Sequence, residues 1–174
     1  ITTLNGTFAD INNVYTANTE GTISGLGNEA ITISEAITVA QFNDLAAKTT
    51  GVITATISDQ DMASLSGITE SGHALTISVT DIVVVAADLN ALNAKTLVAL
   101  EIVVATTIAG SAADITSVYD ANAAGQIYGL GNEELIITDL TISASSLNTL
   151  NTNTTGTLKA LTVTSITGST ADIN

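Results

Sequence analysis

The sequence repeats itself, and this internal repetition restricts the possible folds more than any other feature. Residues 1–29 read ITTLNGTFADINNVYTANTEGTISGLGNE, and residues 105–133 read ATTIAGSAADITSVYDANAAGQIYGLGNE. The matched glycines Gly6 and Gly110 give an offset of 110 − 6 = 104 residues. Repetition over such a distance is typical of arrays in which supersecondary units stack on one another and share a continuous core.

The repetition extends through the rest of the chain. A segment that ends at Gly51 resembles one that ends at Gly156, with an offset of 156 − 51 = 105. The second copy therefore contains one inserted residue, which we expect near Glu134. The segment 165–174 reads SITGSTADIN and repeats the start of the chain. The whole of 1–174 is thus predicted to be a single repeat array.

A shorter unit lies inside the long one. A hydroxyl residue is followed three positions later by an acid, an amide or a serine, then at once by an apolar residue, and by a second apolar residue three further on. The hydroxyl oxygen of such a unit accepts from a backbone N–H at a helix start, and the acid or amide reaches back to the cap N–H. Coils are therefore predicted to start near 7, 38, 58, 85, 111, 143 and 169, with Val85 standing in for the hydroxyl in one of them.

Each predicted helix is short and amphipathic, with one apolar stripe that faces inward. The residues expected on these stripes are Ile11, Val14, Phe42, Leu45, Met62, Leu65, Leu89, Leu92, Ile115, Val118, Leu147 and Leu150. Runs rich in β-branched residues lie between the helices and predict strands. These runs are 30–34, 52–57, 74–78, 102–105, 135–138 and 161–164.

The predicted fold class is an α/β, β-rich solenoid. Parallel strands stack in coils of roughly 20 to 32 residues, each with a short capped helix on one side. Aromatic residues are only 3% of the chain, so the core is expected to consist of small branched side chains in shallow layers.

The charge balance excludes several classes of partner. Seventeen acidic residues face three lysines and no arginine, which gives a formal net charge of −14. Binding to a nucleic-acid backbone requires clustered basic residues, so we expect no nucleic-acid partner. The chain contains no apolar run long enough to span a membrane, so no membrane insertion is expected. The negative charge favours divalent cations, of which Ca²⁺ is the one considered.

The GLGNE loops at 25–29 and 129–133 are the most specific local motif. In one interpretation their amide and carboxylate oxygens bind a metal ion such as Ca²⁺, and the candidate ligands are then Asn28, Glu29, Asn132 and Glu133. In the other interpretation the loops are turns, in which glycine supplies positive φ angles. No other cofactor is expected.

No catalytic constellation is found. His73 is the only histidine, and no third member of a triad accompanies it. We interpret it as an ordinary solvated or turn residue. The protein is therefore predicted not to be an enzyme, and no small-molecule substrate is expected. Threonine pairs such as Thr54 and Thr56 resemble the ice-binding ladders of some antifreeze proteins, but threonine is also a common outward residue of strands.

The repeat segments resemble tandem repeats of very large surface or secreted proteins of cyanobacteria and other aquatic bacteria. The segments that carry this resemblance are GTFADINNVY at 6–15, GSAADITSVY at 110–119, GSTADIN at 168–174, LNALNAKT at 89–96 and LNTLNTNTTG at 147–156. The resemblance implies a modular, fibrous or adhesive protein that is located outside the cell or on its surface. It implies no catalytic residue.

The chain begins and ends inside the same type of coil, and neither end carries a polar capping coil. We therefore expect either further repeats in a longer protein or subunits that stack end to end. The predicted function is a structural segment of an extracellular fibre, filament or adhesin stalk that associates with itself. The alternatives are a calcium-, glycan- or ice-binding surface module and a segment of a phage tail fibre.

Overall fold

The computed structural model describes residues 1–173, which form an α/β fold with parallel strands. These residues divide into two compact units. The first comprises Ile1–Ser78 and Ala94–Ala99, and the second comprises Val79–Asn93 and the residues from Leu100 onward. Within the described part of the chain, no helix has the length and apolar character required to cross a membrane.

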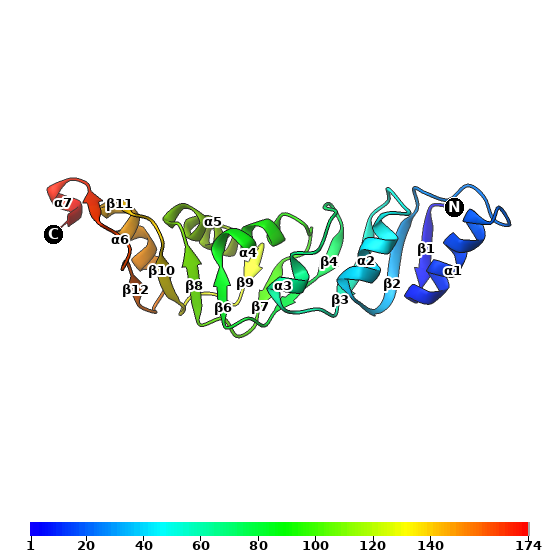
Figure 1. Ribbon diagram of the computed structural model, residues 1–174, viewed down its shortest axis with the longest axis horizontal. Coiled ribbons are helices and arrows are strands. Elements are labelled where there is room, and N and C mark those ends of the chain that lie inside the picture. Colours follow the sequence, from blue (N-terminus) through cyan, green and yellow to red (C-terminus); the bar gives the residue numbers. More distant parts are fainter. Residues whose placement is uncertain (174) are drawn as a thin grey trace. The chain divides into compact units, whose positions relative to one another are not determined.

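In the first unit, strands and helices alternate along the chain (Figure 1). The elements are β1 (Thr3–Gly6), α1 (Phe8–Thr19), β2 (Ala30–Ile37), α2 (Val39–Ala46), β3 (Ile53–Ile57), α3 (Met62–Leu65) and β4 (Ala74–Thr76). The four strands form one parallel sheet in the order β1-β2-β3-β4, so each helix connects two neighbouring strands. We call a strand, the helix after it and the loop to the next strand a strand–helix repeat.

The register of this sheet places apolar residues in line across the strands. Leu4 pairs with Ile31, and Ile31 pairs with Ile53. Ile31 and Ile53 are fully buried, and burial of one such side chain contributes about 1.5–3 kcal/mol. The neighbouring residue along each strand faces solvent, as the exposed pair Thr32 and Thr54 shows. The threonine ladder is short, because Ala74 is the next partner of Thr54.

The second unit contains a parallel sheet in the order β12-β10-β8-β6 and a separate pair, β11-β13. The strands of these sheets are β6 (Val83–Val85), β8 (Thr107–Gly110), β10 (Glu134–Ile137), β11 (Thr141–Ser143), β12 (Leu158–Lys159) and β13 (Ser165–Thr167). The helices are α4 (Ala86–Asn93), α5 (Ala112–Ala123), α6 (Ala144–Asn153) and α7 (Thr170–Ile173). A three-stranded sheet has the order β5-β7-β9, formed by β5 (Ser78–Val79), β7 (Leu100–Ile102) and β9 (Ile127–Tyr128).

The predicted N-caps are confirmed at four helices. The side-chain oxygens of Thr7, Thr38, Ser111 and Ser143 each accept from the backbone N–H three residues on. Of these four caps, Thr38 has the reciprocal contact, in which Gln41 accepts from the cap N–H. At Thr7 and Ser111 the hydroxyl instead donates to the aspartate three residues later. Before α7 an aspartate does make the reciprocal contact, because the Ser169 N–H donates to Asp172 at 3.3 Å, compared with 2.9 Å from the Thr38 N–H to Gln41.

One predicted cap is wrong. Ser58 does not begin a helix; α3 starts at Met62, and Asp61 is its N-cap, accepting from the Ser64 N–H at 2.9 Å. Aspartate is as good a cap as serine, so the choice between them depends on the path of the chain after β3. Three residues expected on the inward stripes, Val14, Met62 and Leu147, are only partly buried.

The strand predictions fail in two places. The run 102–105 extends past the end of β7, and Val103 is 51% exposed. The run 161–164 lies between β12 and β13, in a turn. Several extended segments directly before helices were not predicted, β8 and β13 among them, because they are short and contain small or polar residues.

The inserted residue lies later than expected. The partners of Gly6 and Gly110 are Ile33 and Ile137, which still differ by 137 − 33 = 104. The N-caps Thr38 and Ser143 differ by 143 − 38 = 105. The insertion therefore falls between Ile137 and Ser143, where β2 of the first unit corresponds to two separate strands, β10 and β11.

Candidate functional site

The GLGNE loop of the first unit closes around a buried carboxylate. Glu29 has 0% of its surface exposed. Its Oε1 accepts from the Tyr15 hydroxyl of α1, and its Oε2 accepts from the N–H groups of Gly27 at 2.8 Å and Asn28 at 3.2 Å. The carboxylate therefore satisfies donors from the loop itself and from the helix that precedes the loop.

The second unit repeats the arrangement. Glu133 is also 0% exposed. It accepts from the Tyr119 hydroxyl at 2.7 Å and from the Gly131 N–H at 2.9 Å. We call these two groupings, Tyr15 with Glu29 and Tyr119 with Glu133, the Tyr–Glu latches. In both latches the tyrosine lies 14 residues before the glutamate.

The following strand–helix repeat locks each latch from the backbone side. The hydroxyls of Thr49 and Thr154 donate to the backbone oxygens of Glu29 and Glu133, both at 2.7 Å. A Cβ atom at Gly51 would lie 2.2 Å from the Glu29 oxygen, so only glycine fits at this close approach. The sequence TTG occurs at 49–51 and again at 154–156. Its recurrence is therefore explained by its contacts to the two latches.

Hydrogen bonding sets the charge state of the first latch. Burial alone would raise the pKa of Glu29, but the hydrogen bonds from Tyr15 and from the Gly27 and Asn28 backbone outweigh it and lower this pKa. Burial and the neighbouring Glu29 carboxylate raise the pKa of Tyr15. The pKa of Tyr119 is raised for the same reasons, with Glu133 as its neighbour. The first latch therefore consists of a neutral phenol that donates to a carboxylate.

The four candidate metal ligands are thus placed in two separate loops. Asn28 and Asn132 are exposed, whereas Glu29 and Glu133 are buried and accept hydrogen bonds from protein donors. Among residues 1–173, no three acidic or histidine side chains gather closely enough to hold a metal ion. The turn interpretation accounts for the loop geometry; calcium binding stays a prediction.

His73 was expected to be a solvated or a turn residue, and the first of these expectations is wrong, because only 8% of its surface is exposed. Its Nδ1 accepts from the Ile53 N–H at 3.0 Å, at the start of β3. The ring meets Phe42 edge-on, with 5.3 Å between the ring centroids. Burial lowers the pKa of His73, and Glu70 partly opposes this effect. The neutral ring therefore acts as an acceptor for the first N–H group of β3.

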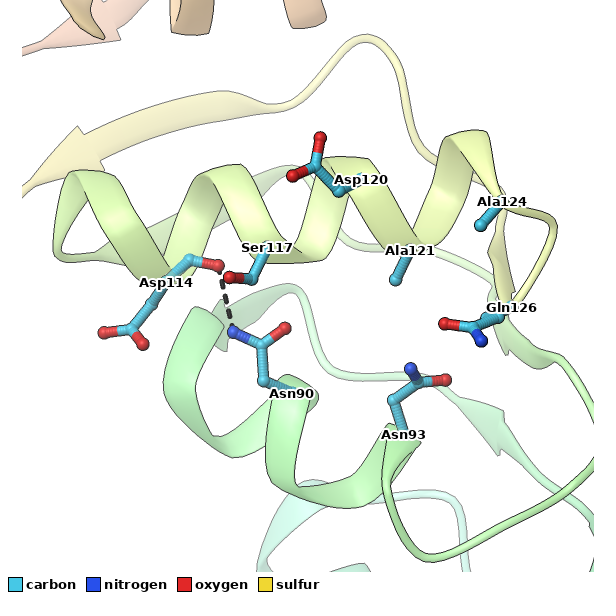
Figure 2. A pocket seen from close by; sticks show the side chains of 8 residues that line it. All are labelled: Asn90, Asn93, Asp114, Ser117, Asp120, Ala121, Ala124 and Gln126. Carbon is cyan, nitrogen blue, oxygen red and sulfur yellow. Dashed lines mark hydrogen bonds between the residues drawn. The ribbon is translucent and has the colours of Figure 1, made fainter.

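A shallow open groove of about 640 Å³ lies between α4 and α5 in the second unit (Figure 2). Asn90 and Asn93 line it from α4, and Asp114, Ser117 and Asp120 line it from α5. Asn90 is already engaged, because its Nδ2 donates to the backbone oxygen of Asp114 at 3.0 Å. The Ser117 hydroxyl is also engaged, because it donates to the Ala113 backbone oxygen at 3.1 Å. The remaining amide and carboxylate groups offer hydrogen-bond donors and acceptors to the groove.

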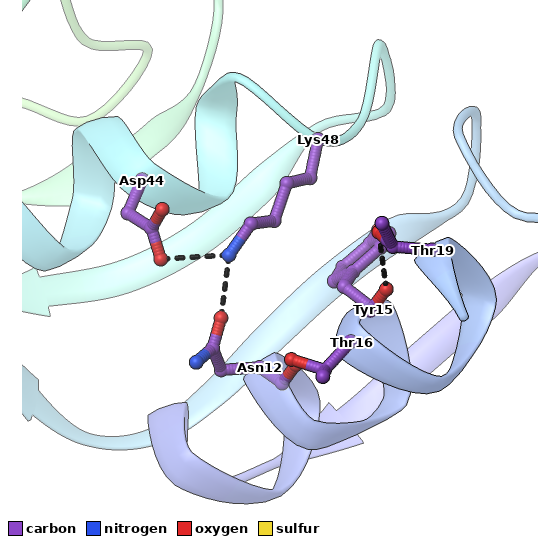
Figure 3. A network of polar contacts seen from close by, with 6 residues as sticks. All are labelled: Asn12, Tyr15, Thr16, Thr19, Asp44 and Lys48. Carbon is purple, nitrogen blue, oxygen red and sulfur yellow. Dashed lines mark hydrogen bonds and ion pairs between the residues drawn. The ribbon is translucent and has the colours of Figure 1, made fainter.

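The lysines bridge neighbouring strand–helix repeats. Figure 3 shows Lys48 between Asp44, at 2.7 Å, and the Asn12 side chain of α1. Lys95 donates to the Thr69 backbone oxygen at 2.9 Å, and Lys159 pairs with Glu134 at 2.7 Å. The few cations of this acidic chain are therefore used inside each unit.

The role of three further acids was missed in the sequence. The first N–H groups of α1, α2 and α5 donate to Glu35 at 3.1 Å, Asp59 at 2.6 Å and Asp139 at 2.6 Å. Glu35 lies within the next strand, β2, whereas Asp59 and Asp139 follow the next strand; the separations are 20 to 27 residues. The only signal in the sequence is that an acid recurs at 35 and 139, again 104 residues apart.

No known family model, curated protein or solved structure was found to match this chain.

Proposed function

We propose that the chain is a structural repeat segment of an extracellular fibre, filament or adhesin stalk, in which the strand–helix repeats stack as a solenoid. The acids serve as helix caps, loop acceptors and ion-pair partners, and the lysines join repeats. These roles account for the unusual composition through folding alone.

The observation that carries this proposal is a parallel pairing between strands of two repeats, which occurs twice in the second unit and which we call the joint. Strand β6 pairs with β8 through Val84 and Ile108, and β11 pairs with β13 through Ile142 and Ile166. The two pairings have the same register at an offset of 142 − 84 = 166 − 108 = 58 residues. A chain that makes the same joint repeatedly extends by repetition, which is the property required of a stalk or fibre.

Side-chain clamps accompany the joint. Asn90 of α4 donates to the Asp114 backbone oxygen of α5 at 3.0 Å, and Asn148 of α6 donates to the Asp172 backbone oxygen of α7 at 2.9 Å. Both asparagines reach 24 residues along the chain. Buried apolar contacts, ladder hydrogen bonds and these clamps together hold one repeat on the next, while the net charge of −14 keeps the surface soluble.

Negative-stain electron microscopy of the native material, with and without a calcium chelator, tests the proposal. Fibres of uniform width are the expected result. Loss of the fibres on chelation would add calcium as a clamp between repeats. Compact single particles under both conditions would contradict the fibre function and favour a monomeric binding module.

The groove between α4 and α5 supports a second candidate, a surface module that binds glycans. Its amide, hydroxyl and carboxylate groups offer both donors and acceptors to sugar hydroxyls. A glycan-array screen with the intact chain tests it. Binding that the substitution Asn93→Ala weakens, and that Asn151→Ala on α6 does not, would favour this candidate over the fibre.

A further inference from the structure

In each joint we call β8 or β13 the receiving strand. A glycine stands at or directly after the end of each receiving strand, Gly110 in β8 and Gly168 after β13. A Cβ atom at Gly110 would lie 3.0 Å from the Ala86 Cβ at the start of α4. A Cβ atom at Gly168 would lie 3.2 Å from the Ala144 Cβ at the start of α6. In both joints the alanine at the start of the helix therefore packs on the bare glycine backbone, and a side chain at the glycine would make this contact tighter than ordinary van der Waals packing.

The same receiving segment occurs a third time, at β1 and α1. Gly6 corresponds to Gly110 and Gly168, and Asp10 corresponds to Asp114 and Asp172. A Cβ atom at Gly6 would meet nothing closer than 3.6 Å, and the nearest atom belongs to Asp10 of the same repeat. The φ angle of Gly6 is also not in the left-handed region. Among residues 1–173, no contact requires glycine at position 6, whereas an alanine docked from another repeat would leave little room for a Cβ atom there.

The apolar residue in the middle of each receiving segment is buried to a degree that depends on how many strands lie beside it. Ile108, which has strands on both sides, is 0% exposed. Leu4 has only β2 beside it among the described strands and is partly buried. Ile166 has only β11 beside it and is 53% exposed. A crevice of about 150 Å³, lined by Ala144 and Ile166 among others, lies at this last joint.

We propose that β11 and α6 of a second copy of this chain dock on β1 and α1, in exchange for that copy's own β13 and α7. The register of the existing joint predicts the pairs: Thr141 beside Thr3, Ile142 beside Leu4 and Ser143 beside Asn5. Ala144 would then pack on Gly6, and Asn148 would donate to the Asp10 backbone oxygen. This interface rests on the proposed repeat function and identifies the partner through which copies associate.

The exchange replaces the β11–β13 pairing by a β11–β1 pairing of equal length. The equilibrium between separate and associated copies therefore depends on the apolar contacts and on protein concentration. Leu4 gains a second neighbouring strand, as Ile108 has, while the released Ile166 was poorly buried to begin with. The tethered segment β13–α7 has the advantage of a high effective concentration. Association is therefore expected to be slow and to increase with protein concentration.

Disulfide trapping tests the interface, because the chain contains no cysteine of its own. Two single-cysteine variants, Thr141→Cys and Thr3→Cys, are mixed as intact chains of different mass and oxidised. The predicted register brings their Cα atoms within disulfide range. The control mixture pairs Thr141→Cys with Asn5→Cys, two residues out of register and beyond that range. A crosslinked heterodimer in the first mixture and not in the second is the expected result.

A second variant examines the packing itself. Adding Gly6→Ala to the Thr3→Cys chain is expected to lower the yield of crosslink, since the new Cβ would meet Ala144, while the melting temperature of that chain alone stays unchanged. Absence of the crosslink, or equal yields in both mixtures, would overturn the proposal. Native fibres seen by microscopy despite such a result would show that the interface proposal alone has failed and that the repeat function stands.

Discussion

At the scale of residues, the Tyr–Glu latches show how buried carboxylates can be structural. Glu133 accepts from the Tyr119 hydroxyl and from the Gly131 N–H, and its backbone oxygen accepts from Thr154. A buried charge without such donors would be strongly destabilising. We therefore attribute the recurrence of GLGNE to closure of the loop on the helix that precedes it.

The substitution Tyr119→Phe should lower the free energy of unfolding by about 1–3 kcal/mol, because it leaves the buried Glu133 carboxylate without its hydroxyl donor. Urea unfolding followed by circular dichroism measures the change. Tyr128→Phe is the matched control, since Tyr128 is 48% exposed, and it should have little effect. Equal losses in the two variants would contradict the role assigned to the latch.

His73 should make the stability of the first unit depend on pH. Its pKa is lowered by burial in the folded state, so the unfolded chain takes up a proton at a higher pH, near 6.5. The stabilising contribution is complete above that pH and is lost as the pH falls through and below it. Melting temperatures at pH 7.5 and pH 5.5 should differ more in the native chain than in His73→Asn, which retains an acceptor but does not titrate. Equal differences in the two proteins would rule out His73 as the titrating group.

At the scale of elements, several helix starts receive a carboxylate from the repeat that follows. Asp139 accepts from the Ala112 N–H, the first N–H of α5, at 2.6 Å. A carboxylate at this position satisfies an unpaired donor and interacts favourably with the helix dipole. Because Asp139 follows β10, the contact couples helix formation to the pairing of the next strand.

Asp139→Ala is therefore expected to destabilise the second unit by about 0.5–2 kcal/mol, the usual value for loss of a helix cap. Asp120→Ala, which removes an exposed carboxylate from the last turn of α5, is the control of equal charge change. Urea unfolding of both variants gives the comparison. A loss no larger than that of the control would mean that the Asp139 contact contributes nothing to stability.

At the scale of the whole molecule, the net charge of −14 is the property that affects stability most widely, because it acts over all repeats at once. Mutual repulsion of the carboxylates opposes both folding and self-association, and salt screens it. The melting temperature should therefore rise with NaCl concentration. CaCl₂ at the same ionic strength distinguishes screening from binding: an equal rise indicates screening alone, and a larger rise with Ca²⁺ than with Mg²⁺ would indicate a calcium site.

The sequence by itself determined the α/β class, the parallel strands and most helix starts, because these depend on local patterns such as a capping hydroxyl or a β-branched run. It did not show that Glu29 lies under Tyr15, that His73 is buried against Phe42, or that Glu35 and Asp139 cap helices of earlier repeats. These contacts join residues 14 to 31 positions apart in the sequence. Closure of a loop on its preceding helix brings Glu29 to Tyr15, and the pairing of successive strands brings the other residues together. Tertiary structure likewise chose Asp61 over Ser58 as a cap, because both residues suit the position locally and the path of the chain after β3 decides between them.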